Sequence, residues 1–290
     1  MTLDVDTLCS QSGGALEAMR ERIRALGSAL VAFSGGVDST FVLKVAIDEL
    51  GDKVVALTAI SASVAPDEAA EAKALAAQLG ARHQLVDSHE LDNPLYAANP
   101  SNRCYFCKSE LYTITDAACA KLGYAAVLDG FNADDKKDHR PGHQAAREHQ
   151  VLSPLAEAGL TKDQIRAWSK RLGLATWDKP QMACLASRLP YGTAVTSDRL
   201  TKVGDAERAV RSLGFKNFRV RFHDDVARLE VAADEFPRLL DPKIRLAIDA
   251  GIKACGFAFV ALDLEPFRSG RLNDALRKDG GAHSLPVLAG

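Results

Sequence analysis

The sequence predicts an α/β protein with an open parallel sheet, followed by a smaller α+β domain. Apolar runs that suit buried strands alternate with helical stretches as far as about residue 190, and this alternation is typical of a parallel sheet covered by helices on both faces. Beyond that point, a long helix precedes two short strands in which polar and apolar residues alternate. We therefore predict a first domain over residues 1–190 and a second over residues 191–290.

The first domain is expected to contain several strand and helix pairs. In chain order we predict a helix over 15–27, a strand over 30–33, a helix over 40–50, a strand over 54–60, a helix over 66–79, a strand over 83–86, a helix over 109–122, a strand over 125–128 and a helix over 161–172. Gly51 and Gly80 end two of these helices, because glycine readily adopts the left-handed conformation that follows a helix. Thr161 and Gln164 can cap the last one.

The second domain is expected to follow a different pattern. We predict a helix over 198–213, strands over 217–223 and 227–231, a helical stretch over 234–250 and a strand over 258–264. Pro242 should divide the helical stretch in two, because proline is tolerated in the first turn of a helix and not in its interior.

Composition narrows the class of protein. The net charge is -2 and 47% of the residues are hydrophobic, which does not suit a general polyanion binder. The start of the chain carries Asp4 and Asp6 where a secretory signal would be basic, and no apolar run is long enough for a membrane span. We expect a cytoplasmic protein. Six cysteines are too few for a disulfide scaffold, so close cysteines suggest metal or sulfur chemistry.

The segment between the first strand and the next helix has the composition of a phosphate-binding loop. It reads Ser34-Gly35-Gly36-Val37-Asp38-Ser39. Backbone N–H groups and the helix dipole converge on an anion at such a place, serine hydroxyls can donate to phosphate oxygens, and an aspartate can hold Mg²⁺. A plain glycine turn is the alternative. No Walker-type lysine motif is present in the sequence, which disfavours γ-phosphoryl transfer.

This hexapeptide resembles the signature of the PP-loop ATP pyrophosphatases, whose fold is Rossmann-like. The resemblance implies that ATP is cleaved between its α- and β-phosphates and that a substrate oxygen is adenylated, with Mg·ATP as cofactor. Ala32, at the end of the preceding strand, and Gly130, which follows another strand, are expected beside the nucleotide together with the loop residues.

Three further segments narrow the resemblance. They are Asn102 to Lys108, Asp129 to Asp135 with Asp138 to Gly142, and Lys179 to Gly192. With Phe267 to Gly270, the sequence resembles the LarE family over nearly its whole length. This resemblance implies a sulfurtransferase that adenylates the carboxyl groups of pyridinium-3,5-biscarboxylic acid mononucleotide and replaces them with thiocarboxylates, in the pathway to the nickel-pincer cofactor of lactate racemase.

Cys184 is the candidate sulfur carrier. Arg188 lies four residues further on, and a neighbouring cation favours a thiolate and an anionic substrate. The alternative is a buried structural cysteine. In the sacrificial reaction that the resemblance implies, Cys184 attacks the acyl-adenylate, loses its sulfur by elimination and is left as dehydroalanine.

Cys104 and Cys107 form a C-x-x-C pair that this single-cysteine reaction does not need. With Cys184 they could hold a [4Fe–4S] cluster with one iron open to exogenous sulfide, as in the tRNA thiolases that the chain also resembles. A redox pair, half of a zinc site and an incidental spacing are the alternatives.

Arg219 and Arg221 alternate with apolar residues along a predicted strand and so share one face. Two arginines suit the phosphate of a mononucleotide, and Glu207 can add a carboxylate to the same site, which is where the resemblance puts the substrate phosphate. Pairing of the arginines with Glu230 across the hairpin is the alternative. In the loop after Gly130, Asp134, Asp135, Asp138 and Arg140 could hold magnesium and phosphate or could simply be solvated.

Other functions share some of these features. A tRNA thiolase would need an RNA-binding surface, which the net charge of -2 does not favour, and an adenylating synthetase without sulfur chemistry would leave three cysteines unexplained. A non-catalytic nucleotide sensor would release no pyrophosphate. As partners we expect the pyridinium nucleotide, proteins of the nickel-cofactor pathway and further copies of this chain, with neither nucleic acid nor membrane.

Overall fold

The computed structural model describes residues 3–137, 141–180, 183–268 and 270–274. The chain divides into two compact units, residues 1–182 and 183–290. Our predicted boundary lies eight residues later. The difference arises because the short 3₁₀ helix η4 (Leu185–Arg188) packs against elements of the second unit. Motif residues outside the described residues are Asp138, His139, Arg140, Gln181, Met182 and Ser269.

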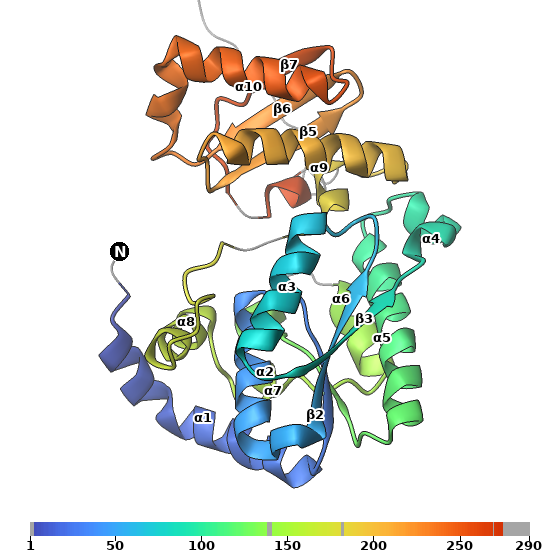
Figure 1. The fold of residues 1–290 in the computed structure, drawn as a ribbon, viewed down its shortest axis with the longest axis vertical. Helices are drawn as coiled ribbons and strands as arrows, with labels where there is room; N and C mark the ends of the chain where they lie inside the picture. The colour runs from blue at the N-terminus through green and yellow to red at the C-terminus, as the bar shows by residue number, and fades with distance from the viewer. Residues whose placement is uncertain (1–2, 138–140, 181–182, 269, 275–290) are drawn as a thin grey trace, which may run out of the picture. The chain divides into compact units, whose positions relative to one another are not determined.

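The first unit contains the predicted open parallel sheet. Its strands are β1 (Ala29–Ala32), β2 (Val54–Ile60), β3 (Arg82–Asp87) and β4 (Val127–Leu128). They are all parallel and lie in the order β3-β2-β1-β4. Figure 1 labels two neighbouring strands of this sheet, β2 and β3. The chain therefore builds the sheet outward from β1 to β3 and then places β4 on the other side of β1. Ligands bind at such a switch point in open α/β sheets.

Helices and short 3₁₀ turns precede, connect and follow these strands. They are α1 (Val5–Leu26), α2 (Val37–Leu50), η1 (Gly51–Lys53), α3 (Pro66–Gln78), η2 (Glu90–Asp92), α4 (Pro94–Ala97), α5 (Arg103–Leu122), η3 (Asp134–Lys137), α6 (Pro141–Glu148), α7 (Pro154–Glu157) and α8 (Lys162–Arg171). Among the described residues, no helix is long and apolar enough to cross a membrane.

Three of these helices begin earlier than predicted, and α2 does so by three residues, at Val37. α1 starts at Val5, where the Asp4 side chain accepts a hydrogen bond from the Thr7 backbone N–H, and it runs through a pair of glycines without a break. α5 starts at Arg103 and not at residue 109, so its first turn contains the C-x-x-C pair. Burial of Arg103 favours this earlier start, because tertiary packing overrides local propensity.

The core of the first unit lies on both faces of the sheet. Along β1, Ala29 and Val31 pack with residues of α1, α2, α3 and α8, whereas Leu30 packs with residues of α5 and α6 on the opposite face. This is the period of two that a strand imposes on its side chains. Both faces are covered by helices, which is why β1 is apolar throughout.

The second unit is the smaller α+β domain. It contains α9 (Ser197–Ser212), β5 (Phe218–His223), β6 (Val226–Val231), η5 (Phe236–Leu240), α10 (Pro242–Ala254), β7 (Phe259–Leu262) and η6 (Arg271–Asn273). Its sheet has the order β5-β6-β7, with β5 antiparallel and β7 parallel to β6. Pro242 is the first residue of α10, as predicted, and it separates this helix from η5.

We expect truncation of a buried side chain in the first unit to cost far more stability than truncation of an exposed one. Leu43 on α2 is fully buried, whereas the Leu95 side chain on α4 is 58% exposed. Leu43→Ala should lower the free energy of unfolding by about 2–5 kcal/mol because it leaves a cavity, and Leu95→Ala should change it by less than about 0.5 kcal/mol. Urea denaturation followed by circular dichroism measures both, and equal losses would contradict the described packing.

Candidate active site

The phosphate loop connects β1, which ends at Ala32, to α2. Gly35 has a φ of +67°, and a Cβ at this position would lie 3.2 Å from the Cα and Cβ atoms of Ala72 on α3. Glycine is therefore required here both for its backbone conformation and for its size. The Ser34 and Ser39 hydroxyls lie 3.0 Å apart and the Ser39 Oγ accepts from the Ser34 backbone N–H at 3.2 Å. The hydrogen bonds between the two serines thus join the first and last residues of the loop.

The amino end of α2 opens into this loop. Gly36 is the N-cap residue, and as a glycine it has no side chain that could cap the helix. The first N–H groups of a helix lack intrahelical acceptors and together carry the positive end of the helix dipole. An anion such as a phosphate can take the place that a capping side chain would otherwise occupy.

Asp38, in the first turn of α2, has two carboxylate oxygens in different surroundings. Oδ2 forms an ion pair with the ammonium group of Lys162. Oδ1 is buried and accepts no hydrogen bond from the described residues. A buried carboxylate oxygen without a donor is well suited to a hard cation. The Asp38 carboxylate therefore fits the Mg²⁺ that the resemblance implies, and its role as a ligand stays a prediction.

Gly130 lies where the carboxyl end of β4 meets the loop. A Cβ at this position would lie 3.0 Å from the Ser39 backbone nitrogen and 3.2 Å from the Asp38 Cβ. The backbone after β4 therefore packs directly on the amino end of α2. Gly130 and the loop residues predicted from the sequence come together at the switch point of the sheet.

Asp129 precedes this glycine and connects it to α5. Its Oδ2 accepts a hydrogen bond from the Tyr112 hydroxyl at 2.9 Å, and its Oδ1 accepts from the Phe131 N–H at 3.1 Å. Burial raises the pKa of the Asp129 carboxyl in spite of these donors. Burial and the adjacent Asp129 carboxylate also raise the pKa of the Tyr112 phenol well above its ordinary value. This buried pair fixes α5 to the ligand-binding edge.

The cysteine pair lies at the amino end of the same helix. Cys104 is exposed and Cys107 is half-buried, and their spacing places them on one face of α5. Within the described parts of the chain, no group of three or more His, Cys, Asp or Glu side chains is arranged to hold a metal ion. The [4Fe–4S] cluster therefore stays a prediction.

Sequence reasoning missed two lysines that reach the phosphate loop. Lys162 contacts Asp38, and Lys179 donates to the Gly35 carbonyl at 3.1 Å and to Glu71 at 2.9 Å. They follow Asp38 by more than 120 residues in the sequence, so only the fold reveals the contacts. One signal was available for Lys162. It is the first residue of a helix, where the dipole disfavours a cation.

In the second unit, Cys184 immediately precedes η4 and is half-buried. Its carbonyl accepts a hydrogen bond from Arg188 at 3.0 Å. The Arg188 guanidinium also forms a bidentate ion pair with Glu207, with two contacts of 2.8 Å, and each side chain is only 3% exposed. These contacts attach the cysteine-bearing segment to α9. Arg188 thus contacts the backbone around Cys184, and the predicted effect of its charge on the Cys184 thiol stays a prediction.

A second buried ion pair supports the same segment from the sheet. Arg221 on β5 pairs with Glu230 on β6 at 3.0 Å and donates to the Ser187 carbonyl at 2.8 Å. The cross-hairpin pairing that we considered as the alternative is therefore present for Arg221. Arg219 lies on the same strand. Burial first, and then the charges of Arg188 and other arginines, lower the pKa of Arg219 to about 10.

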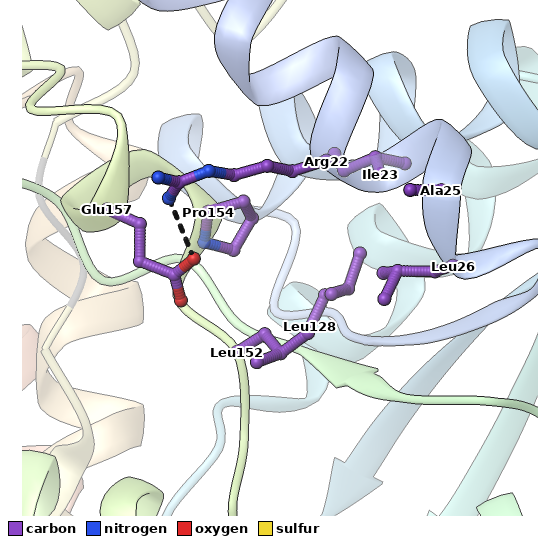
Figure 2. A pocket seen from close by; sticks show the side chains of 8 residues that line it. All are labelled: Arg22, Ile23, Ala25, Leu26, Leu128, Leu152, Pro154 and Glu157. Carbon is purple, nitrogen blue, oxygen red and sulfur yellow. Dashed lines mark hydrogen bonds and ion pairs between the residues drawn. The ribbon is translucent and has the colours of Figure 1, made fainter.

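An apolar pocket beside α1 carries none of the predicted site residues. Figure 2 shows its lining, which consists of Arg22, Ile23, Ala25, Leu26, Leu128, Leu152, Pro154 and Glu157. The two charged members, Arg22 and Glu157, form an ion pair of 3.1 Å with each other. The lining thus offers apolar surface and one satisfied ion pair, and it adds no reactive group to the site.

Closing the space above Gly130 should impair nucleotide binding. Gly130→Ala inserts a methyl group within 3.2 Å of the loop, so we expect affinity for Mg·ATP to fall by about tenfold or more, because overpacking shifts backbone that must contact phosphate. Gly14→Ala on α1 is the matched control, because a Cβ there meets nothing within 4 Å. Calorimetric titration of both variants measures the difference, and unchanged affinity in Gly130→Ala would rule out this geometry.

The buried Glu207 should make stability depend on acid pH. Burial raises its pKa, but the ion pair with Arg188 and the nearby Arg219 outweigh burial and hold the pKa below its usual range. A carboxyl whose pKa is lowered by folding stabilises the protein above its ordinary pKa and loses this contribution as the pH falls through the folded value. Glu207→Gln should cost about 3–5 kcal/mol at neutral pH and flatten the acid limb of the stability curve.

The control for Glu207→Gln is Asp205→Asn, which breaks the exposed pair with Arg208. An exposed ion pair contributes at most about 1 kcal/mol. Urea unfolding from about pH 3 to about pH 7, which spans the ordinary range of carboxyl pKa values, compares the two variants. If Glu207→Gln retained the acid dependence of the wild type, the ion pair would not be its source.

The amino-acid sequence is similar to several known proteins. Residues 16–98, which include the phosphate loop, match the asparagine synthase family. The chain is 46% identical over 91% of its length to an uncharacterized protein of Synechocystis, of which it covers 98%. A 7-cyano-7-deazaguanine synthase of Desulforudis audaxviator is 26% identical over 55% of the chain and 81% of that protein.

A further relative matches nearly the whole chain. The chain is 39% identical, over 94% of its length and 97% of the relative, to pyridinium-3,5-bisthiocarboxylic acid mononucleotide synthase of Lactiplantibacillus plantarum. This relative carries the family assignment, because both its identity and its coverage are high. The chain therefore belongs to the LarE family of PP-loop enzymes and is an ATP-dependent sulfurtransferase.

Proposed function

We propose that this protein converts pyridinium-3,5-biscarboxylic acid mononucleotide into its thiocarboxylate form by ATP-dependent adenylation and sulfur transfer. The near-full-length match to a synthase named for the bisthiocarboxylic acid product carries this proposal. The phosphate loop with Asp38 in the first unit and the cysteine-bearing segment in the second support it. We also propose a cytoplasmic location and a homo-oligomer.

Adenylation activates a carboxylate that would otherwise repel a thiolate. A substrate carboxylate oxygen attacks the α-phosphorus of ATP, the bond from this phosphorus to the bridging oxygen breaks, and pyrophosphate leaves with the electron pair. Helix N–H groups at Gly36 and beyond would receive the phosphates. Mg²⁺, held by Asp38 when bound, would supply positive charge to the departing pyrophosphate.

Sulfur transfer would then use Cys184. Its thiolate attacks the acyl carbon, AMP leaves, and a thioester forms. Removal of the Cα proton of Cys184 and cleavage of its Cβ–Sγ bond release the thiocarboxylate and leave dehydroalanine. The backbone contacts of Arg188 and Arg221 around residues 184–187 support this role, because they hold the segment in one conformation through buried ion pairs.

The alternative sulfur source uses the same cysteine with two others. Thiolates of Cys104, Cys107 and Cys184 would hold a [4Fe–4S] cluster, which supplies an open iron site for exogenous sulfide. The exposure of Cys104 and the common helix face of Cys104 and Cys107 support this second source. The enzyme would then work repeatedly, and its mass would not change.

The substrate phosphate is proposed to bind at Arg219 and Arg221. The charges of Arg188, Arg221 and Arg211 act on Arg219 and lower its pKa, whereas the charge of Glu207 raises it. The lowered pKa of Arg219 reflects its burial and this crowding of positive charge. A dianionic phosphate would be attracted by these arginines and could accept bidentate hydrogen bonds from them.

Removing the Cys184 thiol should separate the two half-reactions. We expect Cys184→Ala to form no thiocarboxylate, because no sulfur reaches the acyl carbon, while pyrophosphate release in a single turnover continues. Cys255→Ala, which alters another half-buried thiol of the second unit, is the control and should keep both steps. Thiocarboxylate formation by Cys184→Ala would show that the sulfur comes from elsewhere.

Anaerobic purification distinguishes the two sulfur sources. About four irons per chain with an unchanged protein mass after one turnover would identify the cluster. No iron and a mass loss matching H₂S at Cys184 would identify the sacrificial reaction. Failure to release pyrophosphate with the dicarboxylate nucleotide would contradict the proposed substrate itself.

A further inference from the structure

We propose that Phe267 is a positioning residue for substrate binding, because its ring holds the guanidinium group of Arg219 in place for the phosphate of the mononucleotide. This inference rests on the proposed function in taking Arg219 as a phosphate ligand. No comparison assigns a role to this phenylalanine, which acts through Arg219 and needs no contact with the substrate itself. The contacts that carry the argument all lie within the second unit.

The Phe267 ring lies against the Arg219 guanidinium. The central carbon of the guanidinium is 4.7 Å from the centre of the ring, and both residues are half-buried. An aromatic ring attracts a cation through its quadrupole, and the attraction becomes stronger where water is excluded. The contact also restrains a long side chain that would otherwise sample many rotamers. The ring therefore both stabilises the charge and fixes its position.

A guanidinium that contacts a ring can still bind an anion. The five N–H donors of an arginine point outward in the plane of the group, so a ring on one side leaves donors on the other. One donor of Arg219 binds the Phe218 carbonyl at 2.7 Å, and a phosphate needs two for a bidentate contact. A carboxylate partner would compete with a phosphate for these donors, whereas an aromatic partner does not.

The surroundings of Arg219 make this support useful. Burial first, and then the charges of neighbouring arginines, lower the pKa of Arg219 to about 10. The group stays charged at neutral pH, but its cation is less stable there than in water. An aromatic ring favours the charged form without adding a negative charge that would repel a phosphate. Phe267 thus suits an arginine that has to receive an anion.

Backbone hydrogen bonds place Phe267 beside the sheet. Just after β7, the Asp263 N–H donates to the Leu229 carbonyl on β6 at 2.9 Å. Further along, the Phe267 N–H donates to the Val231 carbonyl at the end of β6 at 2.8 Å. The chain therefore continues alongside β6, the strand that pairs with β5 and so with the strand that carries Arg219.

Polar contacts hold this segment in place. Arg271 pairs with Asp263 at 2.9 Å and with Glu265 at 2.7 Å, so the chain on both sides of Phe267 is joined. Leu264, in the same segment, is 90% exposed. Burial of this apolar side chain therefore does not explain the path of the segment. The segment is tied to the sheet by polar contacts, and it brings an aromatic ring to the arginine proposed for the phosphate.

The test compares four variants of the full chain. Phe267→Ala removes the ring, Phe267→Tyr keeps it, and Phe267→Leu keeps an apolar side chain without an aromatic ring. Leu264→Ala is the matched control, because it truncates an exposed apolar residue of the same segment. Thermal unfolding of each variant checks that it is folded.

Calorimetric titration uses two probes that differ only in the phosphate, pyridinium-3,5-biscarboxylic acid mononucleotide and its nucleoside. We expect Phe267→Ala to weaken binding of the mononucleotide by about 3- to 30-fold, which is the range for a cation–π contact, and to leave binding of the nucleoside unchanged. Phe267→Leu should behave like the alanine variant. Phe267→Tyr and Leu264→Ala should match the wild type.

Two further measurements separate positioning from a structural role. The KM of Phe267→Ala for the mononucleotide should rise while kcat for pyrophosphate release is unchanged, because a phosphate distant from the reacting carboxylate is bound equally in the ground state and the transition state. A double-mutant cycle then shows whether Phe267 acts through Arg219. In an Arg219→Ala background, Phe267→Ala should cost no further affinity for the mononucleotide.

Other results would overturn the inference. Equal loss of affinity for both probes, or a loss that persists without Arg219, would mean that Phe267 contacts the substrate directly. Full affinity in Phe267→Leu would reduce the residue to apolar packing, and full affinity in Phe267→Ala would remove any role. If the wild type bound both probes equally, the phosphate site would be wrong and the inference would fall with it. The proposed function fails separately if the wild type binds the mononucleotide but releases no pyrophosphate from Mg·ATP.

Discussion

The contact between Gly130 and the amino end of α2 is the constraint on which the candidate site depends. The Gly130 backbone lies so close to Ser39 and Asp38 that a single Cβ would reach 3.0 Å from the Ser39 nitrogen. This packing is possible only because β4 lies beside β1 in the sheet. The strand order thus brings two segments that are about ninety residues apart in sequence to one edge, and it is the reason that a phosphate loop and a nucleotide-facing loop can meet.

The same packing brings opposite charges together at this edge of the sheet. The amino end of α2 attracts anions, yet it also carries the carboxylate of Asp38, which would repel them. Lys162 neutralises one oxygen of that carboxylate, and the other is buried with no hydrogen-bond donor among the described residues. The site is therefore arranged for a polyanion accompanied by a hard cation, and not for a simple anion. This distinction favours a metal-bound triphosphate over a single phosphate group.

The sequence predicted most of the first unit because its elements follow local rules. The apolar runs of β1 and β2, the helix-ending Gly51 and the capping box at Thr161 are confirmed. The start of α5 was predicted too late because Arg103, a charged residue, is buried there. The Arg103 side chain donates to the Asn99 side-chain oxygen, four residues before it, and a pattern of apolar residues does not reveal that a charged residue is buried.

The candidate site was predictable to the extent that its residues form a contiguous motif. The loop from Ser34 to Ser39 and the glycine after β4 are found where we expected them. The contacts of Lys162 and Lys179 with the loop escaped prediction because more than 120 residues separate each lysine from the loop residue that it contacts. The contact of Lys162 with Asp38 spans 124 residues, and it exists only because α8 begins beside the segment that follows β4.

The buried arginines of the second unit make contacts that residue type alone did not predict. Arg188 and Arg221 were predicted as anion-binding groups, and each has a buried carboxylate partner and donates to backbone near Cys184. Burying an ion pair costs much of its Coulombic gain in desolvation, so two such pairs around one short segment are a costly way to gain stability alone. They are a reasonable way to fix a segment in one conformation. Burial first, and then the charges of neighbouring arginines, lower the pKa of Arg219 to about 10, so its charged guanidinium is costly there and an anion bound beside it would favour the charged form.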